Sequence, residues 1–248
     1  MEIITALAAS GMRARTEILD LLANNIANSA TPGYKADGES YDLYFGESAW
    51  DGVNANRPAA GEMPLVQTTW TNYAQGTLVQ TGSPGDLAIS GGGFFAVQGK
   101  TKPLYTRNGH FRVTKQGALE TEDGYAALGS DGKPIQLDPA EPFQVNSSGQ
   151  VSQGGAAVVT LQVVIPDTPS SFTKQTGAYF QLTDDGKTMP APNAEIRQGS
   201  SESSNVEPTE ASVRLVSAMR QFEMMQKAIR TASEMGKESV EQVAKLPS

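Results

Sequence analysis

Glycine and proline, the residues that most readily break helices and form turns, are concentrated in the middle of this chain. Residues 1–35 and 205–248 hold only 3 of the 25 glycines and 3 of the 14 prolines. Both ends carry apolar residues at helical spacing, whereas the middle consists of short apolar runs separated by turns. We therefore expect an α+β fold in which N- and C-terminal helices flank a central all-β domain.

An apolar stripe with a seven-residue repeat predicts a helix of about 27 residues at the N-terminus. Pro32 restricts the residue before it to extended conformations and Gly33 supplies a turn, so the helix should end before them. Small residues in the stripe would let another helix approach closely, at some cost in helix propensity. The stripe consists of Ile4, Leu7, Gly11, Ala14, Ile18 and Leu21, widened by Leu22, Ala23 and Ile26.

A second stripe predicts a helix at the C-terminus. Ser204 and Glu207 have the spacing of a capping box, and Pro208 falls in the first turn, where a missing N–H is tolerated. One such helix alone could simply pack on the protein's own β domain. Two stripes at opposite ends favour a coiled-coil-like assembly domain, in which the helices pack against each other and against other chains. The C-terminal heptad positions are Leu215, Ala218, Phe222, Met225, Ile229 and Ala232.

The middle of the chain has the pattern of short strands and tight turns. Asn108-Gly109 lies between two strand-like runs, residues 104–107 and 111–114, and predicts a hairpin. Gln116-Gly117 and Asp123-Gly124 bracket the next short strand, and the run Gly91-Gly92-Gly93 indicates a tight bend between strands. The expected organisation is a terminal helical polymerisation domain (1–35 and 205–248), an extended connecting segment (36–79) and a central β domain (80–204).

Charge is unevenly distributed along the chain. The two terminal segments together contain nine basic and nine acidic residues, so the net charge of -8 belongs to the middle. Nucleic-acid affinity depends on clustered Lys and Arg, so an acidic middle argues against a nucleic-acid partner. The chain has no cysteine and no 18-residue apolar stretch, and its first residues lack a basic start followed by an apolar run. We expect no disulfide, no membrane insertion and no cleaved signal peptide.

Residues that could support catalysis are few. His110 is the single histidine, so a metal site with two histidines is excluded, and we expect its side chain to project from a strand end. The glycine run is followed by Phe94-Phe95 rather than by Lys-Ser, which excludes a phosphate-binding loop. We therefore expect a non-enzymatic structural subunit without catalytic, cofactor-binding or metal residues. The alternative from another class is a carbohydrate-binding or hydrolytic β domain in the acidic middle.

Three separated motifs resemble the axial flagellar rod and hook proteins. The N-terminal GMRARTEILDLLANNIANSATPGYK is similar to that family's helix followed by Ala-Asn-Asn-Leu-Ala-Asn and Thr-x-Gly-aromatic-Lys, with Ile26 in place of the leucine. Residues 85–95 and 105–111 resemble the central β-domain signature. Ser204-Asn205-Val206 and residues 219–223 resemble the closing helix. The motifs follow the family's order and cover both ends and the centre of the chain.

The resemblance implies a structural subunit of the bacterial flagellar basal-body rod. Residues 204–211 and 222–224 look more like the proximal-rod member than the distal-rod member, which is the runner-up. Such a subunit would pass through the flagellum-specific type III export apparatus without a cleaved signal. It would polymerise helically in the periplasm with itself and other rod proteins, forming part of the drive shaft between motor and hook.

The heptads and the resemblance together predict the residues in contacts between subunits. Asn24, Asn25 and Asn28 could bond to a neighbouring backbone or only cap the end of the first helix, and both alternatives stand. The predicted subunit-interface residues are Leu7, Gly11, Ile18, Leu22, Asn24, Asn25, Ile26, Asn28, Asn205, Val206, Leu215, Phe222, Met225 and Ile229.

Overall fold

The computed structural model describes the backbone of residues 2–44 and 63–244, and the side chains of residues 11–39, 69–231 and 233–237. The chain forms two compact units. We call the first the helical unit; it contains Met1–Ala27, Asp37–Thr71 and Glu207–Ser248. We call the second the β unit; it contains Asn28–Ala36 and Asn72–Val206.

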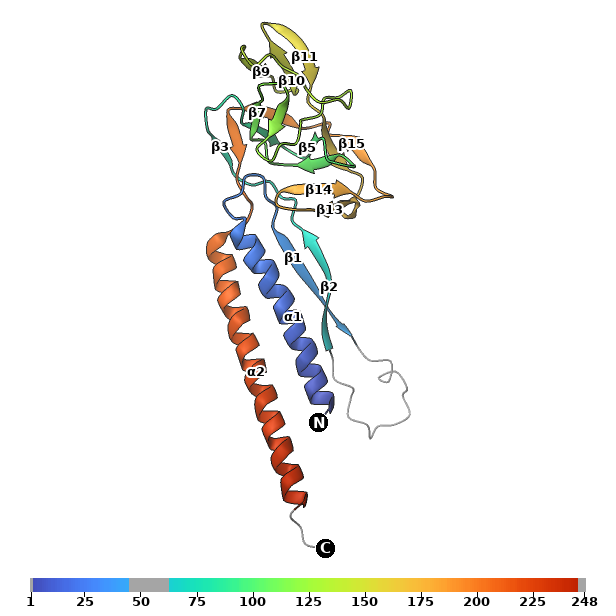
Figure 1. The fold of residues 1–248 in the computed structure, drawn as a ribbon, viewed down its shortest axis with the longest axis vertical. Helices are drawn as coiled ribbons and strands as arrows, with labels where there is room; N and C mark the ends of the chain where they lie inside the picture. The colour runs from blue at the N-terminus through green and yellow to red at the C-terminus, as the bar shows by residue number, and fades with distance from the viewer. Residues whose placement is uncertain (1, 45–62, 245–248) are drawn as a thin grey trace. The chain divides into compact units, whose positions relative to one another are not determined.

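Two long helices, drawn in blue and red in Figure 1, dominate the helical unit. Helix α1 covers Glu2–Ala27 and ends before Pro32, close to the predicted length. Helix α2 covers Pro208–Ala244 and begins at the predicted proline, and Glu210 in its first turn complements the positive end of the helix dipole. The expectation of a helix at each end of the chain is confirmed.

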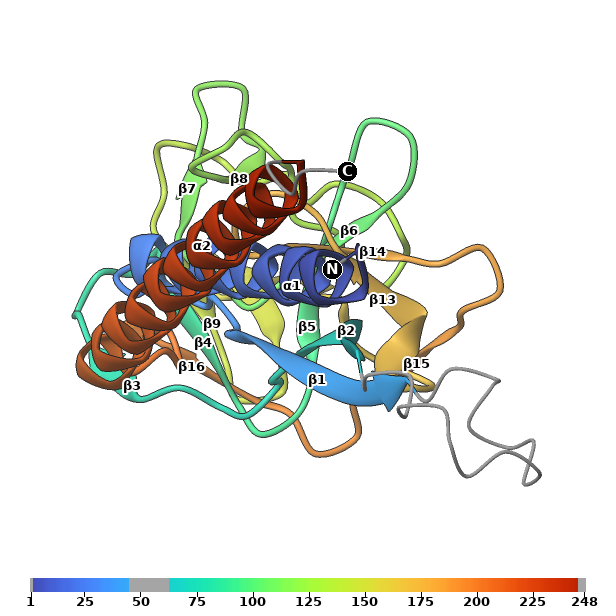
Figure 2. The same ribbon diagram turned by 90° about the horizontal axis from the view of Figure 1, so that it is seen from below.

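The two helices pack through a small apolar core. Ile18 and Leu22 of α1 and Ala218 of α2 are buried together, and Leu19 and Leu215 pack against them. Figure 1 shows α1 and α2 side by side, and Figure 2 shows α2 crossing α1 obliquely. A Cβ atom on Gly11 would lie 3.4 Å from Sδ of Met225. Gly11 therefore allows a close approach, here to the other helix of the same chain.

A β-hairpin also belongs to the helical unit. Strands β1 (Asp37–Tyr44) and β2 (Met63–Thr71) pair antiparallel from Asp37 opposite Thr71 to Tyr44 opposite Met63. A Cβ atom on Gly38 would lie 2.6 Å from the ring of Trp70, so glycine is needed where the indole crosses the partner strand. These strands lie in the segment expected to be an extended connection.

The β unit is built from short antiparallel strands. Within the described residues its largest sheet has the order β13-β14-β6-β5-β12-β15, a three-stranded sheet has the order β11-β10-β9, and the remaining pairs are β16-β4, β17-β3 and β7-β8. The 3₁₀ helix η2 covers Pro169–Ser171. The strands are β3 (Leu78–Gln80), β4 (Leu87–Ser90), β5 (Phe94–Val97), β6 (Leu104–Thr106), β7 (Phe111–Val113), β8 (Leu119–Thr121), β9 (Phe143–Val145), β10 (Gln150–Gln153), β11 (Ala156–Thr160), β12 (Val163–Pro166), β13 (Phe172–Lys174), β14 (Tyr179–Leu182), β15 (Thr188–Pro190), β16 (Glu195–Gln198) and β17 (Ser200–Glu202).

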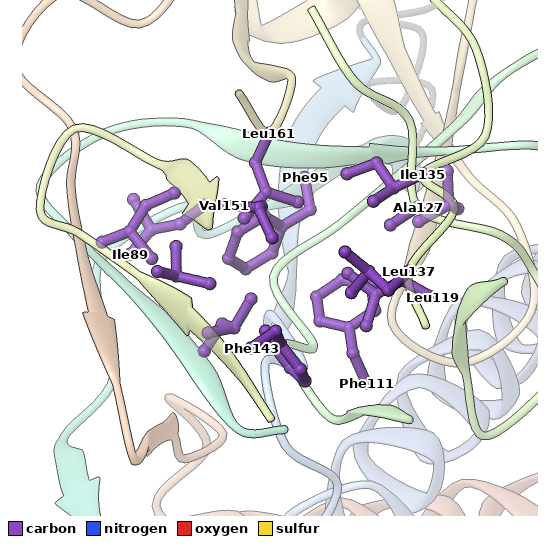
Figure 3. Close-up of a cluster of buried hydrophobic side chains, with 14 of the residues drawn as sticks. Ile89, Phe95, Phe111, Leu119, Ala127, Ile135, Leu137, Phe143, Val151 and Leu161 are labelled. Carbon is purple, nitrogen blue, oxygen red and sulfur yellow. The ribbon is translucent and has the colours of Figure 1, made fainter. Parts of the chain in front are cut away.

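Two apolar clusters lie on opposite faces of β5. Phe95 and Val97 belong to the larger cluster, which Figure 3 shows in close-up with side chains such as Leu119 and Val151 converging from several strands. Phe94 and Ala96 belong to the smaller cluster. Because alternate residues of a strand point to opposite faces, β5 contributes to both clusters and is buried along its whole length. The central β-rich domain expected from the sequence is confirmed.

The predicted turns had different outcomes. Gly91 and Gly93 have positive φ between β4 and β5, and Gly117 and Gly124 have positive φ on either side of β8, as expected. The hairpin predicted at Asn108-Gly109 is wrong, because β6 pairs with β5 and β14 whereas β7 pairs with β8. A Cβ atom on Gly109 would lie 1.6 Å from the carbonyl oxygen of Leu87. This glycine therefore permits a close crossing of two backbones instead of a two-residue turn.

Candidate assembly surface and the ion cluster behind it

Helix α2 has apolar residues on two opposite sides. Ala211 and Ala218 are buried on the side that carries the predicted heptad positions Leu215, Phe222, Met225 and Ile229, all of which are partly buried. The opposite side exposes large apolar side chains, namely Val213 (67 %), Val216 (49 %), Met224 (64 %) and Met235 (57 %). We call this second side the outer face of α2.

The apolar residues of the outer face recur at regular intervals along α2, with polar residues such as Arg220 between them. Val213, Met224 and Met235 are spaced by eleven residues, about three turns at 3.6 residues per turn, and Val216 lies one turn from Val213. A helix that is apolar on one side only packs on a single partner, whereas a second apolar stripe needs a second partner. Isolated exposed apolar residues are common, but an ordered row on one helix indicates a contact surface.

The predicted interface residues fall into different environments. Gly11, Ile18, Leu22 and Asn25 are buried, and Asn24 is exposed. The side chain of Leu7 lies outside the described residues. The remaining predicted residues are partly buried: Ile26, Asn28, Asn205, Val206, Leu215, Phe222, Met225 and Ile229. The heptad spacing predicts the side of α2 that faces α1. It predicts Val216 only as a flanking residue of that side, whereas the structure places Val216 on the outer face.

Asn25 and Asn28 are engaged within their own chain. The amide of Asn25 donates to the Asp37 carbonyl at 2.8 Å, and its oxygen accepts from the Asp37 N–H at 3.0 Å. This reciprocal pair holds the start of β1 against the end of α1. The Oδ1 atom of Asn28 accepts from the Thr31 hydroxyl at 3.2 Å, which satisfies polar groups just after the helix.

Asn205 joins three backbone segments of the β unit. Its oxygen accepts from the Ala36 N–H at 2.7 Å, and its amide nitrogen donates to the carbonyls of Asn72 at 2.8 Å and Ala74 at 3.0 Å. The N–H of Asn72 in turn donates to the Ala36 carbonyl at 2.8 Å. One side chain therefore fixes three points at which the chain passes between the two units.

A buried ion cluster is centred on Glu202, which lies three residues before Asn205. Nζ of Lys35 is 2.5 Å from Oε1 of Glu202, and NH1 of Arg107 is 3.1 Å from Oε2 of the same carboxylate. All three side chains are almost completely buried. Lys35 also donates to the Ala74 carbonyl at 2.8 Å, and Arg107 donates to the Gly91 carbonyl at 2.8 Å. The cluster joins the segment after α1, the interior of the β unit and the strand before α2.

Burial and the neighbouring carboxylate shift the pKa values of the two cations in opposite directions. Burial lowers the pKa of Lys35 and the pKa of Arg107, because it disfavours the charged forms, while the Glu202 carboxylate raises both. The guanidinium of Arg107 also lies 5.3 Å from the ring centroid of Phe94. Each cation therefore depends on the Glu202 carboxylate to offset the cost of burying its charge.

The side chain of His110 is hydrogen-bonded on both ring nitrogens, on one side to strand β17. Its Nδ1 atom is 2.7 Å from Oδ1 of Asp86 and its Nε2 atom is 3.1 Å from the Ser201 hydroxyl. Ser, His and Asp thus lie in the order used by hydrolytic triads, but Ser201 is only 8 % exposed and sits within strand β17. His110 forms a bridge with Asp86 instead of projecting freely, and it ties β17 to the segment before β4.

The described part of the chain lacks two features, a cluster of metal-ligating residues and a membrane-spanning helix. No group of three or more His, Asp or Glu residues there could hold a metal ion. Neither described helix is both long and apolar enough to cross a bilayer. The features that stand out are the paired helices with an exposed apolar stripe and the ion cluster that anchors their connections. These features define an assembly subunit.

Comparison with known proteins specifies the class. Residues 7–35 match the family described as flagella basal body rod protein. Residues 88–153 match the flagellar hook protein FlgE/F/G D1 domain, and residues 197–241 match the flagellar basal body rod FlgEFG protein C-terminal family. The matches follow one another along the chain and include most of both helices.

Individual relatives agree with these matches. The chain is 34% identical over 230 residues to the flagellar basal-body rod protein FlgF of Caulobacter vibrioides, with 92% of each chain covered. It is 28% identical to FlgF of Mesorhizobium japonicum, with 94% of each covered. It is 33% identical to FlgG of Agrobacterium fabrum, with 93% of this chain and 95% of the relative covered.

The chain belongs to the family of flagellar basal-body rod proteins. Within the family it is FlgF-like, with FlgG as the runner-up. It is a structural subunit of the flagellar basal body rather than an enzyme, and it assembles with other rod proteins.

Proposed function

We propose that the chain polymerises helically as a subunit of the proximal rod, with the terminal helices as its polymerisation domain. The observation that carries the proposal is the outer face of α2, where Val213, Met224 and Met235 form an exposed apolar row opposite the side that packs on α1. A contact between two different surfaces of identical subunits produces an open helix when it does not close into a ring. A rod requires such a contact.

The helices gain order in the assembly. Among the side chains that the structure describes, the cluster between α1 and α2 contains three buried residues, Ile18, Leu22 and Ala218, although α2 alone is 37 residues long. Long helices with narrow seams derive most of their stability from tertiary contacts. Neighbouring subunits that cover the outer face supply such contacts and shift the helices toward the ordered state by mass action. The predicted interface residues Gly11, Phe222, Met225 and Ile229 then form the centre of a multi-helix core.

A matched pair of substitutions tests the role of the outer face. Met224→Asp places a charge in the middle of the apolar row, and Met189→Asp places the same charge on strand β15 of the β unit, where Met189 is 48 % exposed. We expect Met224→Asp to leave the thermal unfolding of the monomer unchanged while abolishing filament formation in sedimentation and swimming in a complemented strain. Met189→Asp should keep both. Normal polymerisation and swimming with Met224→Asp would exclude the outer face as an assembly surface.

Amide hydrogen exchange tests the ordering of the helices. In the monomer, α1 and α2 should exchange faster than strands such as β5, which is buried along its length. In the assembled rod, exchange should slow in the helices and remain nearly the same in β5. Equal protection of helices and strands in the monomer would show that the helices are complete without neighbours.

Family membership also supports a proposal on location and route. We propose that the subunit lies in the periplasmic part of the basal body and reaches it through the flagellar type III export apparatus without cleavage. The intact mass of the protein recovered from basal bodies tests whether it is cleaved. Its loss from basal bodies when the export apparatus is disabled tests the route. The distal rod is the second candidate position, since a FlgG relative is 33% identical. Complementation of strains that lack the proximal or the distal subunit separates the two positions.

A further inference from the structure

A cavity of about 160 Å³ lies within the helical unit, between α1, α2 and β1. Its α1 wall consists of Arg15, Ile18 and Leu22, and Glu39 of β1 closes one side. The α2 wall consists of Arg214, Ser217, Ala218 and Gln221. The cavity thus combines the apolar contact between the helices with five polar side chains that can form hydrogen bonds.

Two oxygen atoms of the lining residues lack a donor. Oε2 of Glu39 and Oε1 of Gln221 are both buried, and neither has a hydrogen-bond partner among the described residues. A buried acceptor without a donor costs free energy, and native proteins leave few of them. Neither Arg15 nor Arg214 donates to these oxygens, although both line the same cavity. A single group with at least two N–H donors could satisfy both of these oxygen atoms.

A guanidinium matches this requirement better than a water molecule or an ammonium. Its planar fork donates to two acceptors at once, and a bond to the Glu39 carboxylate would be charge-assisted. Of the two arginines in the lining, Arg214 has a carboxylate of its own, because its Nε atom lies 4.0 Å from Oε1 of Glu210. The Glu39 carboxylate forms no ion pair among the described residues and can accept from the incoming guanidinium.

We propose that this cavity receives the guanidinium of Arg220 from a second copy of the chain. The proposal rests on the proposed function, since Arg220 is exposed on the outer face of α2 and lies four residues after Val216 and four before Met224. Docking of that face on a neighbour therefore brings Arg220 to the contact. The cavity borders the outer face, since Ser217 of its lining lies one turn after Val213, but Arg220 and the cavity lining are different residues. The contact therefore joins two unlike sites and can repeat along a filament.

Crosslinking between copies tests the contact directly. The chain has no cysteine, so single thiols can be introduced at chosen positions. Copies with Glu39→Cys and copies with Arg220→Cys, carrying tags of different size, are mixed under assembly conditions and treated with a short bismaleimide. A mixed-tag dimer is expected. The control replaces Glu39→Cys by Asp20→Cys, on the exposed side of α1, and should give little mixed product.

A double-mutant cycle measures the energetic coupling. Glu39→Gln and Arg220→Gln should each raise the protein concentration needed for assembly by roughly tenfold, and the double variant should be no worse than either single one. Thermal unfolding of each monomer serves as the folding control. Additive effects of the two substitutions would overturn the proposal. Wild-type assembly of Glu39→Gln, together with no crosslink above the control, would also overturn it and would show that the cavity holds only solvent.

The outer-face variant separates this proposal from the one on which it rests. If Met224→Asp prevents assembly while Glu39→Gln and Arg220→Gln assemble normally, the cavity has no role and the assembly surface stands. If Met224→Asp also assembles normally, the assembly surface itself is wrong.

Discussion

The ammonium of Lys35 lies 2.5 Å from a carboxylate oxygen of Glu202, although the two residues are 167 positions apart in the chain. Neither side chain is accessible to solvent. The second oxygen of the carboxylate accepts from Arg107. Because Lys35 follows α1 by a few residues and Glu202 precedes α2 by a few, this ion pair fixes the two connections to the terminal helices at one place in the β unit.

Removal of the lysine charge should destabilise the β unit. Lys35→Met leaves Glu202 buried with one cation instead of two, and breaking a buried pair costs about 3 kcal/mol. Urea unfolding of the monomer should show this loss, whereas Lys133→Met, at an exposed lysine, should stay within about 0.5 kcal/mol of the parent. A Lys35→Met protein as stable as the Lys133→Met control would show that the pair contributes nothing to folding.

Phe222→Asp should separate assembly from folding of the β unit. Phe222 lies on the side of α2 that faces α1, and a carboxylate there disfavours the helix pair by about 3 kcal/mol or more. Hydrogen exchange of the strands should remain as in the parent, while polymerisation and swimming are lost. Phe222→Leu, which keeps the side apolar, should retain both. A motile strain that carries Phe222→Asp would contradict the assignment of α2 to assembly.

Two glycines with the same backbone conformation should respond differently to alanine. Gly33 has φ of 68° and a Cβ there would lie 2.3 Å from the backbone of Arg107, while Gly132 has φ of 74° and open space around it. Gly132→Ala should cost about 1 kcal/mol through the strained φ alone. Gly33→Ala should cost about 3 kcal/mol, since the backbone must also move. Equal midpoints in urea would show that the close approach is not required.

Alkaline pH should weaken the β unit through Tyr179. Burial raises the pKa of its phenol well above 10.0, and the hydroxyl donates to Asp123 at 2.7 Å. The folded state thus holds a proton that the unfolded chain loses near pH 10. The stabilisation is complete below that pH and is lost as the pH rises above it. Tyr179→Phe should therefore lose less stability than the parent above about pH 10, as measured by urea unfolding across that pH range.

The parts of this fold that were predictable from sequence are those set by local chemistry. Pro32 and Pro208 marked the limits of α1 and α2, and Gly117 and Gly124 marked the turns on either side of β8. In each case the residue acts on its own backbone, so no knowledge of a distant partner is required.

Asn108-Gly109 shows why the same reasoning fails elsewhere. The dipeptide suits a two-residue hairpin, yet a type I′ turn needs positive φ at both positions and neither residue has it. Gly109 is instead required because the Leu87 backbone passes directly against it. Which strands meet at a glycine depends on packing of the whole β unit, and that information is not local.

The assembly surface was only half predictable for a similar reason. Heptad spacing predicts the side of α2 with Ala218 and Phe222, which faces the other helix, whereas Val213 and Met224 lie outside the repeat. A second apolar row at eleven-residue spacing was the signal that could have found them. The pairing of Lys35 with Glu202 had no comparable signal, since no periodicity relates residues so far apart.

Asn205 has a consequence for how such subunits can diverge. Its single amide bonds to the backbone of Ala36, Asn72 and Ala74. The points at which the chain enters and leaves the β unit are therefore held together within that unit. Domains whose chain ends lie close together tolerate exchange and insertion. A chimera that takes its β unit from another rod protein therefore has to reproduce the backbone positions at residues 36, 72 and 205 at which the chain leaves and re-enters that unit.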